Sequence, residues 1–273
     1  MDNSQKKVSF EFGLACDVGR KRKGEPNQDA VEVILRNPSN SSHPPLLIVA
    51  DGLGGHRGGS TASKIVIQVF KQEFLQAQHP TNYSQLLGIC ARKAHRAIRE
   101  LGSYDSNISD MGSTVVAVVL EEKRIYLLNV GDSRAYILRA EKIIQISQDQ
   151  SWVAAQVRSG LLSAEEALKH PYRSRLNMSI SAKRSDITSY TTEKLLEPND
   201  TVVLCSDGLW GVIPESLIWA TASELHPQVA ADKLIALANN SQGPDNISVI
   251  VARQFILERK AAAISMDDTD PGL

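Results

Sequence analysis

The chain has 273 residues, of which 42% are hydrophobic and 22% are charged, a composition typical of a globular protein with a sizeable core. Its formal net charge of −1 gives no overall positive field, so neither nucleic acid nor an anionic membrane is an expected partner. No apolar run approaches the roughly 20 residues of a membrane-spanning helix, and residues 1–7 lack the apolar centre of a secretory signal. Three widely spaced cysteines in apolar surroundings predict buried, reduced thiols and a cytoplasmic protein. They are Cys16, Cys90 and Cys205.

The first part of the chain changes from a strand pattern to a helix pattern. Strands are predicted at 8–14, 30–35 and 46–50, the last of them fully apolar. This apolar strand ends at Asp51 and is followed by a glycine-rich stretch that reaches Gly59. Apolar residues then recur at helical spacing, which predicts a helix capped by Ser60 or Thr61 and a second helix over 83–101.

The second part is rich in strands and contains one long irregular segment. Further strands are predicted at 113–120, 124–130, 135–138, 143–146, 201–205 and 247–252, and short helices at 214–222 and 228–239. The segment 149–184 begins with a helical pattern and then loses it, so we expect a mobile excursion laid over a sheet. Helix pairs between runs of strands predict layered sheets in one domain, 1–257. Residues 258–273 are small, polar and acidic, and are expected to be disordered.

Four aspartates occupy the same kind of position, at the end or the beginning of a predicted strand beside turn residues. They are Asp29, Asp51, Asp207 and Asp245. Several carboxylates gathered in one place would repel one another, and a hard cation such as Mg²⁺ or Mn²⁺ resolves that repulsion. For any single aspartate, the alternative is that it only caps its own turn. The common pattern of all four favours a metal site.

These residues carry a resemblance to a known family. The segments that carry it, in chain order, are Asn27-Gln28-Asp29, Asp51-Gly52-Leu53-Gly54-Gly55-His56, Gly112-Ser113-Thr114, Gly131-Asp132-Ser133-Arg134, Ser206-Asp207-Gly208-Leu209-Trp210 and Asp245-Asn246. The set resembles the metal-dependent protein phosphatases of the protein phosphatase 2C type. The Gly-Gly-His form of the second segment is similar to bacterial members.

The resemblance implies an α+β fold, a four-layer α-β-β-α sandwich whose two central, mainly antiparallel sheets are flanked by helix pairs. It also implies a serine/threonine phosphatase that holds two Mn²⁺ or Mg²⁺ ions and uses a metal-bridging water as the nucleophile. By family position, Asp51 bridges both ions, the carbonyl of Gly52 ligates one, and Asp207 and Asp245 hold the other. Asp29 supports the site directly or through water. Asp110 matches the family's ligand for a third, weaker ion.

Two further site residues follow from the resemblance with alternatives left open. The family's phosphate-binding arginine position holds Gly24 here, so Arg22 or Lys23 would supply the charge. Arg22 is favoured because a guanidinium can grip phosphate through two parallel hydrogen bonds, and the alternative is a solvated basic turn. His56 could give a proton to the leaving alkoxide, or hydrogen-bond a metal-bound water or its own turn. Asp132 is expected only to hold its turn together.

The resemblance also suggests partners and a flap. The expected partners are phosphorylated protein substrates and a cognate serine/threonine kinase, with no nucleic acid and no membrane, and the chain is expected to be a monomer. The segment 149–184 would form a flap beside the metal cleft, with Arg173 and Arg175 placed to meet a phosphopeptide. Two alternatives remain: a pseudophosphatase that serves as a regulatory binding module, and a two-metal hydrolase of small phosphate esters. A nucleotide-binding glycine loop is disfavoured because no Lys-Ser/Thr follows the glycines.

Overall fold

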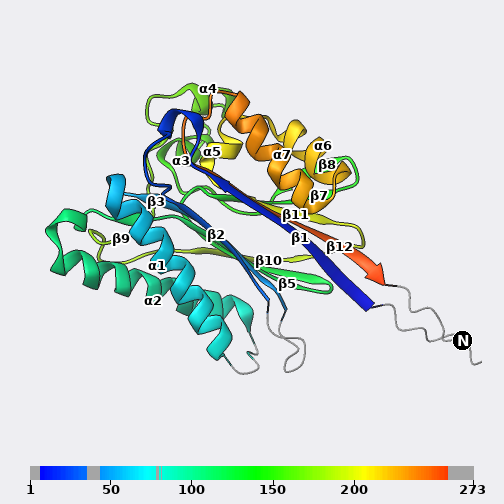
Figure 1. Cartoon of the computed structure of the whole chain (residues 1–273), viewed down its shortest axis with the longest axis horizontal. Helices are drawn as coiled ribbons and strands as arrows, with labels where there is room; N and C mark the ends of the chain where they lie inside the picture. The colour runs from blue at the N-terminus through cyan, green and yellow to red at the C-terminus, as the bar shows by residue number, and fades with distance from the viewer. Residues whose placement is uncertain (1–6, 36–43, 78–79, 81, 258–273) are drawn as a thin grey trace, which may run out of the picture.

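The computed structural model describes residues 7–35, 44–77, 80 and 82–257 (Figure 1). Every strand pair in this described part of the chain is antiparallel. The predicted disordered tail, 258–273, lies outside the described residues. Among the described residues, no helix combines the length and the apolar character needed to cross a bilayer.

The first sheet has five strands, and its first and last strands in sequence lie side by side. The spatial order is β1 (Lys7–Asp17), β12 (Ile247–Leu257), β11 (Thr201–Cys205), β7 (Arg134–Arg139) and β8 (Lys142–Gln145). β1 and β12 pair over their whole length, from Lys7 opposite Leu257 to Asp17 opposite Ile247. The first and the last strand of the described residues therefore form one ladder.

The second sheet has seven strands. The spatial order is β10 (Tyr190–Leu195), β6 (Arg124–Val130), β5 (Val115–Glu121), β3 (Leu46–Leu53), β4 (Gly112–Ser113) and β9 (Ile180–Ser181), with β2 (Asp29–Ile34) also paired to β3. β3 is apolar because Leu46 to Ala50 are all buried within this sheet. The short strand β4 links the end of β3 to β9, since Gly52 pairs with Ser113, and Ser113 pairs with Ile180.

Helices cover the outer face of each sheet, as Figure 1 shows. Those on the seven-stranded sheet are α1 (Gly55–Gln76) and α2 (Tyr83–Tyr104), and those on the five-stranded sheet are α5 (Asp207–Trp210), α6 (Glu215–Glu224) and α7 (Pro227–Asn240). The segment 149–184 contains α3 (Trp152–Arg158) and α4 (Ala164–Lys169). The predicted four-layer α-β-β-α arrangement is confirmed.

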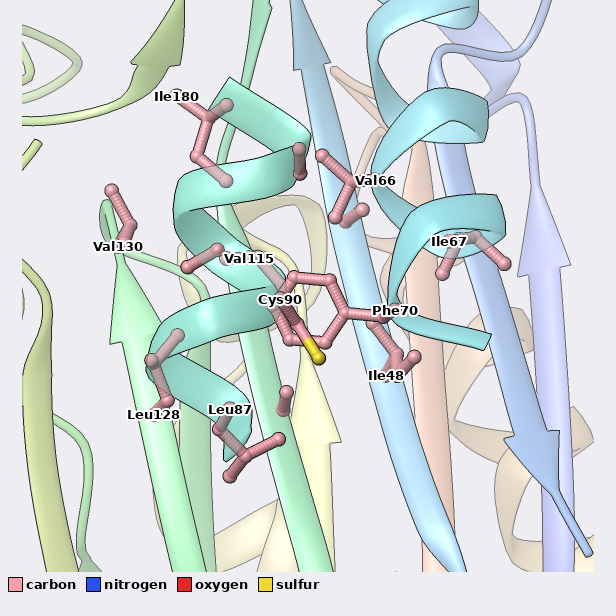
Figure 2. Close-up of a cluster of buried hydrophobic side chains, with 14 of the residues drawn as sticks. Ile48, Val66, Ile67, Phe70, Leu87, Cys90, Val115, Leu128, Val130 and Ile180 are labelled. Atoms are coloured by element: carbon pink, nitrogen blue, oxygen red, sulfur yellow. The ribbon is translucent and has the colours of Figure 1, made fainter. Parts of the chain in front are cut away.

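Three hydrophobic clusters hold the four layers together. One lies between α1, α2 and the seven-stranded sheet, where Phe70, Leu87 and Cys90 pack on Ile48 and Leu128 (Figure 2). A second lies between the two sheets, and a third between the five-stranded sheet and α5 to α7. The cluster between the two sheets is formed by side chains on the inner face of each sheet. It therefore fixes how one sheet lies on the other, and with it the edge where the loops of both sheets come together.

The structure differs from the sequence predictions in several places, among them the predicted strand 113–120, which is divided into β4 and β5. The first helix begins at Gly55 and not after Ser60, with Gly54 in the left-handed conformation (φ 107°) as its N-cap. The strands β9 and β10 were not predicted, because β9 has only two residues and most of β10 is exposed and polar. Cys16 is exposed, whereas Cys90 and Cys205 are buried as expected, and all three are free thiols.

Candidate metal centre

Two of the four predicted aspartates face one another across one strand pair. Asp29 on β2 is the direct partner of Asp51 on β3, so both side chains leave the same face of the seven-stranded sheet. The amide of Gly52 donates to the carbonyl of Gln28 (3.1 Å), which extends this pairing by one residue. Antiparallel register therefore brings together two carboxylates that are 22 positions apart in the sequence.

The other two aspartates come from the five-stranded sheet. Asp207 is the first residue of α5, two positions after the end of β11, and Asp245 lies two positions before β12. Asn246 connects the two sheets, because its side-chain oxygen accepts from the amide of Gln28 (2.9 Å) and its amide nitrogen donates to the carbonyl of Val18 (2.8 Å). This bridge holds the start of β12 next to the start of β2.

A pocket of about 220 Å³ forms where these four strand ends meet. Its lining includes Asp51, Gly52, Asp207, Asp245, Asp132 and Arg22. Asp29 lies buried beside Asp51 with 7% of its surface exposed. Asp110 is exposed and does not line the pocket, but its backbone packs against Gly54: a Cβ on Gly54 would lie 2.9 Å from the carbonyl oxygen of Asp110.

The carboxylates of the pocket are electrostatically frustrated. Removal from water is the main cause that raises the pKa of Asp29 to about 7, with Asp207 and Asp245 acting in the same direction and the hydroxyls of Ser206 and Ser248 opposing it. The same cause, followed by repulsion from Asp245, raises the pKa of Asp207 to about 6. Burial and then Asp29 raise the pKa of Asp51 well above its usual range. Close carboxylates that cannot all ionise are the arrangement a divalent cation stabilises.

The donor set fits a hard divalent cation. Both carboxylate oxygens of buried Asp29 lack a hydrogen-bond partner, and an unpaired buried carboxylate is costly. Carboxylates together with the backbone carbonyl of Gly52 are the ligands that Mg²⁺ and Mn²⁺ prefer. Among the described residues, no three His, Cys, Asp or Glu side chains are already arranged so that they could hold a metal ion.

Arg22 lies at the rim of the pocket and is engaged with one of the predicted ligands. Its Nε lies 2.9 Å from Oδ1 of Asp245, its Nη2 lies 3.2 Å from Oδ2, and Glu25 is 3.6 Å from Nη1. Lys23 is exposed and does not line the pocket. Of the two cations considered from the sequence, Arg22 is therefore the one the fold directs to this site.

The position of His56 is known only for its backbone. It falls in the first turn of α1, directly after Gly54 and Gly55, and its side chain lies outside the described residues. Its role as a proton donor stays a prediction.

The hydroxyl groups of Ser113 and Thr114, two neighbours in one of the recognised segments, hold the backbone of Asp51. The hydroxyl of Ser113 donates to the carbonyl of Asp51 (3.1 Å), and the amide of Asp51 donates to the hydroxyl of Thr114 (3.1 Å). Thr114 in turn shares a hydrogen bond of 2.7 Å with the hydroxyl of Ser133. Because all three hydroxyls are buried or nearly so, the strand end that carries Asp51 is fixed before any ligand binds.

Asp132 belongs to the pocket, which the sequence did not suggest. It is 5% exposed, lines the pocket, and has a pKa raised well above its usual range by burial and then by Asp207. Its backbone carbonyl accepts from the indole of Trp210 (3.1 Å), and Arg134 lies 3.6 Å above that ring. The carbonyl of Asp132 therefore connects its turn to α5, while its carboxylate lies among those of the pocket, and the expected turn-holding role stays a prediction.

The segment 149–184 reaches the pocket through Ser174 and Leu176, which are part of its lining. Trp152, His170 and Tyr172 pack their rings together beneath this stretch, with centroid separations of 4.9 to 5.5 Å. The segment therefore borders the pocket at these two residues, and its action as a flap stays a prediction. Arg173 and Arg175 are exposed and do not line the pocket, so their contact with a phosphopeptide stays a prediction.

Residues 18–241 match the family model described as protein phosphatase 2C. The chain belongs to the protein phosphatase 2C family. Among curated relatives, it is 28% identical to the serine/threonine phosphatase stp of Listeria innocua, over 81% of this chain and 88% of that protein. It is 31% identical to the protein phosphatase PhpP of Streptococcus pneumoniae, over 88% and 96% of the two chains.

Solved structures of the family are similar over almost their whole length. The serine/threonine phosphatase Stp1 from Staphylococcus aureus has a TM-score of 0.82 and 28% identity, covering 90% of this chain and 95% of that one. The catalytic domain of the serine/threonine phosphatase PstP, solved with two manganese ions, has a TM-score of 0.77 and 28% identity, covering 91% and 100%. The fold of this chain is therefore that of bacterial phosphatases of this family.

Proposed function

We propose that this chain is a metal-dependent phosphatase that hydrolyses phosphoserine and phosphothreonine in proteins. The observation that carries the proposal is the pocket where Asp51, Asp207 and Asp245 converge beside buried, unpaired Asp29, with Arg22 at its rim. Membership of the protein phosphatase 2C family, and the names of relatives that are serine/threonine phosphatases, support the substrate class.

The residues that would hold the cations are those the sequence singled out. We propose that Asp51 and the carbonyl of Gly52 hold one Mn²⁺ or Mg²⁺ ion, that Asp51, Asp207 and Asp245 hold the second, and that Asp29 supports Asp51. A third ion would bind at Asp110. When bound, such ions supply Lewis acidity toward phosphoryl oxygens and lower the pKa of water. The solved PstP structure contains two manganese ions. The experiment below compares Mn²⁺ with Mg²⁺ as the activating ion of this chain.

The chain's own residues would position the phosphoryl group and handle protons. Arg22 can present two N–H groups to phosphoryl oxygens once it exchanges Asp245 for substrate. α1 begins at the pocket, where Gly54 is part of the lining, and the free amides of a helix's first turn favour an anion. His56 is proposed to give a proton to the leaving alkoxide of the serine or threonine. Leu176 and Ser174 would contact the substrate on the flap side.

The test is release of phosphate by the purified chain under a matched set of conditions. Phosphothreonine peptide, phosphotyrosine peptide and a small aryl phosphate are each compared with Mn²⁺, with Mg²⁺ and with EDTA. We expect metal-dependent release with the phosphothreonine peptide preferred over the phosphotyrosine peptide. Turnover of the small ester alone would favour the small-ester hydrolase, and no turnover of any substrate would favour a pseudophosphatase.

We further propose that the chain acts as a monomer opposite a cognate serine/threonine kinase in the cytoplasm. The buried free thiols of Cys90 and Cys205 are consistent with a reducing compartment. The mass of the chain in solution and the compartment in which it is found check these two proposals directly.

A further inference from the structure

A second and larger pocket lies away from the metal centre. It has a volume of about 570 Å³ and lies between the second half of α2 and the loop 182–187. This loop follows β9, which lies beside α2 in the fold (Figure 1). It shares no lining residue with the metal pocket. Gly102 allows the close approach of the two walls, since a Cβ there would lie 2.6 Å from the side chain of Ala182. We call this pocket the α2 groove.

Three arginines form one stripe along the α2 groove. Arg92, Arg96 and Arg99 are spaced i, i+4 and i+7, so they lie on one face of the helix. None of the ion pairs found in the described part of the chain involves them. Arg99 is tied at one nitrogen to the carbonyl of Ser185 (3.2 Å). Neighbouring like charges on a helix destabilise it unless an anion lies among them.

A buried histidine completes this wall of the groove. His95 is 6% exposed and lines the groove, yet neither of its ring nitrogens has a hydrogen-bond partner. Burial and then Arg99 lower the pKa of His95, against an opposing effect of Asp186. The neutral ring offers one N–H donor and one acceptor nitrogen. Buried polar atoms without partners are uncommon in folded proteins, so the two ring nitrogens are available to an ordered water or to a ligand that enters the groove.

Two carboxylates, Glu100 and Asp186, also line the groove. Neither lies within ion-pair distance of a groove arginine, in the part of the chain that the structure describes. Glu100 follows Arg96 by four positions and so lies at the outer edge of the stripe. The groove keeps an excess of one positive charge from three arginines and two carboxylates. The positive charge of the groove is concentrated along the stripe of three arginines.

We propose that the α2 groove binds a phosphorylated segment of a protein, with the phosphoryl group held among Arg92, Arg96 and Arg99. Arginine clusters recognise phosphorylated peptides because each guanidinium can donate two parallel hydrogen bonds to a dianion. The volume falls in the range of about 300–1,000 Å³ that holds ligands much larger than one phosphate ion. The stripe extends for about 10 Å, the length of roughly three extended residues.

The biological use of this site rests on the proposed function, whereas the binding of a phosphorylated segment at the α2 groove does not depend on it. A phosphatase whose substrates carry more than one phosphate could retain them at the α2 groove while another phosphate occupies the metal centre. Such a site would raise the local concentration of substrate without taking part in hydrolysis.

The experiment measures binding without turnover. A short fluorescent peptide with one phosphothreonine is titrated with the full chain in EDTA, and fluorescence anisotropy gives the Kd. Arg92→Ala combined with Arg96→Ala should weaken binding at least tenfold, since two charge-assisted contacts are lost. The matched control combines Lys142→Ala and Lys233→Ala, two exposed cations on the other sheet and its helices, and should leave the Kd unchanged. Circular dichroism verifies that both variants are folded.

The competing outcomes are distinct. Equal affinity for the unphosphorylated peptide, or an unchanged Kd in the double arginine variant, would overturn the proposal. Inorganic phosphate that binds as tightly as the peptide would also overturn it, because the groove would then take the ion alone. Failure of the proposed function shows instead as the absence of phosphate release by the unmodified chain in Mn²⁺, which the binding measurement in EDTA does not depend on.

Discussion

At the scale of single residues, Asp51 is the strongest candidate for a metal ligand, because it lines the pocket and hydroxyl groups hold its backbone in place. Asp51→Asn should lower kcat to about a hundredth or less in saturating Mn²⁺, because a lost ligand costs several kcal/mol of the barrier. The metal-free variant should melt at the same temperature or higher, because repulsion with Asp29 falls. Activity, Mn²⁺ affinity by calorimetry and Tm in EDTA check this.

The control for Asp51→Asn is Asp232→Asn, an exposed carboxylate on α7. It removes the same charge and should leave activity and Mn²⁺ affinity unchanged. If the Asp51 variant kept more than about a tenth of the activity, its role as a metal ligand would be wrong.

Arg22 and Lys23 are neighbours that the fold treats differently, because only Arg22 lines the pocket. Arg22→Ala should raise KM for a phosphothreonine peptide about tenfold with a smaller change in kcat, since it removes contacts made in substrate and transition state alike. Lys23→Ala is the matched control and should leave KM unchanged. The opposite result would show that this turn presents Lys23 to the phosphate when substrate binds.

At the scale of secondary structure, the glycines after Asp51 let α1 pack directly on the end of β3. A Cβ on Gly52 would clash with the carbonyl oxygen of Gly59 and lie 2.6 Å from that of Gln28. Both neighbours are backbone atoms, so Gly52→Ala should lower the free energy of unfolding by about 1–3 kcal/mol. Gly88→Ala in α2, whose nearest neighbour is a flexible arginine 3.4 Å away, should raise it by about 0.5–1 kcal/mol. Urea unfolding in EDTA measures both, and equal shifts would contradict the packing argument.

A substitution in the segment 149–184 can test contact with a peptide substrate without changing the metal centre. Leu176 lines the metal pocket, whereas Leu161 in the same segment is 70% exposed and does not. Leu176→Ala should reduce kcat/KM severalfold on a phosphopeptide and little on a small aryl phosphate, which needs only the metal centre. Leu161→Ala should change neither. Equal losses on both substrates would mean that Leu176 shapes the catalytic centre itself.

The sequence predicted most elements because burial enforces a regular pattern. The fully buried strand β11 was predicted with its bounds, and the four aspartates were found because each adjoins a strand and a turn. The start of α1 was predicted wrongly because glycine has a low helix propensity, and close contact between Gly52 and Gly59 overrides it. Asp132 was missed because its carboxylate meets Asp207 only through strand pairing between β7 and β11.

At the scale of the whole molecule, the carboxylates of the metal centre make stability depend on pH. The pKa values of Asp29 and Asp207 are raised to about 7 and about 6 in the folded chain, above about 3.9 in an unfolded chain. Their stabilising contribution is complete below about pH 4 and is lost as pH rises through about 6 to 7. In EDTA, Tm should therefore fall between about pH 4 and pH 7. Saturating Mn²⁺ should reduce that fall, and a flat profile in EDTA would contradict the raised values.

The pairing of β1 with β12 also determines when, during synthesis, the five-stranded sheet can be completed. Asp29 and Asp51 leave the ribosome early, whereas Asp245 and its strand β12 emerge almost 200 residues later. Because β12 lies between β1 and β11, the five-stranded sheet stays divided until β12 has been synthesised, and contacts between such distant segments form slowly. A nascent chain that has not yet released β12 has only part of the proposed set of metal ligands. We therefore expect the growing polypeptide to be unable to remove phosphate from a substrate before β12 is in place.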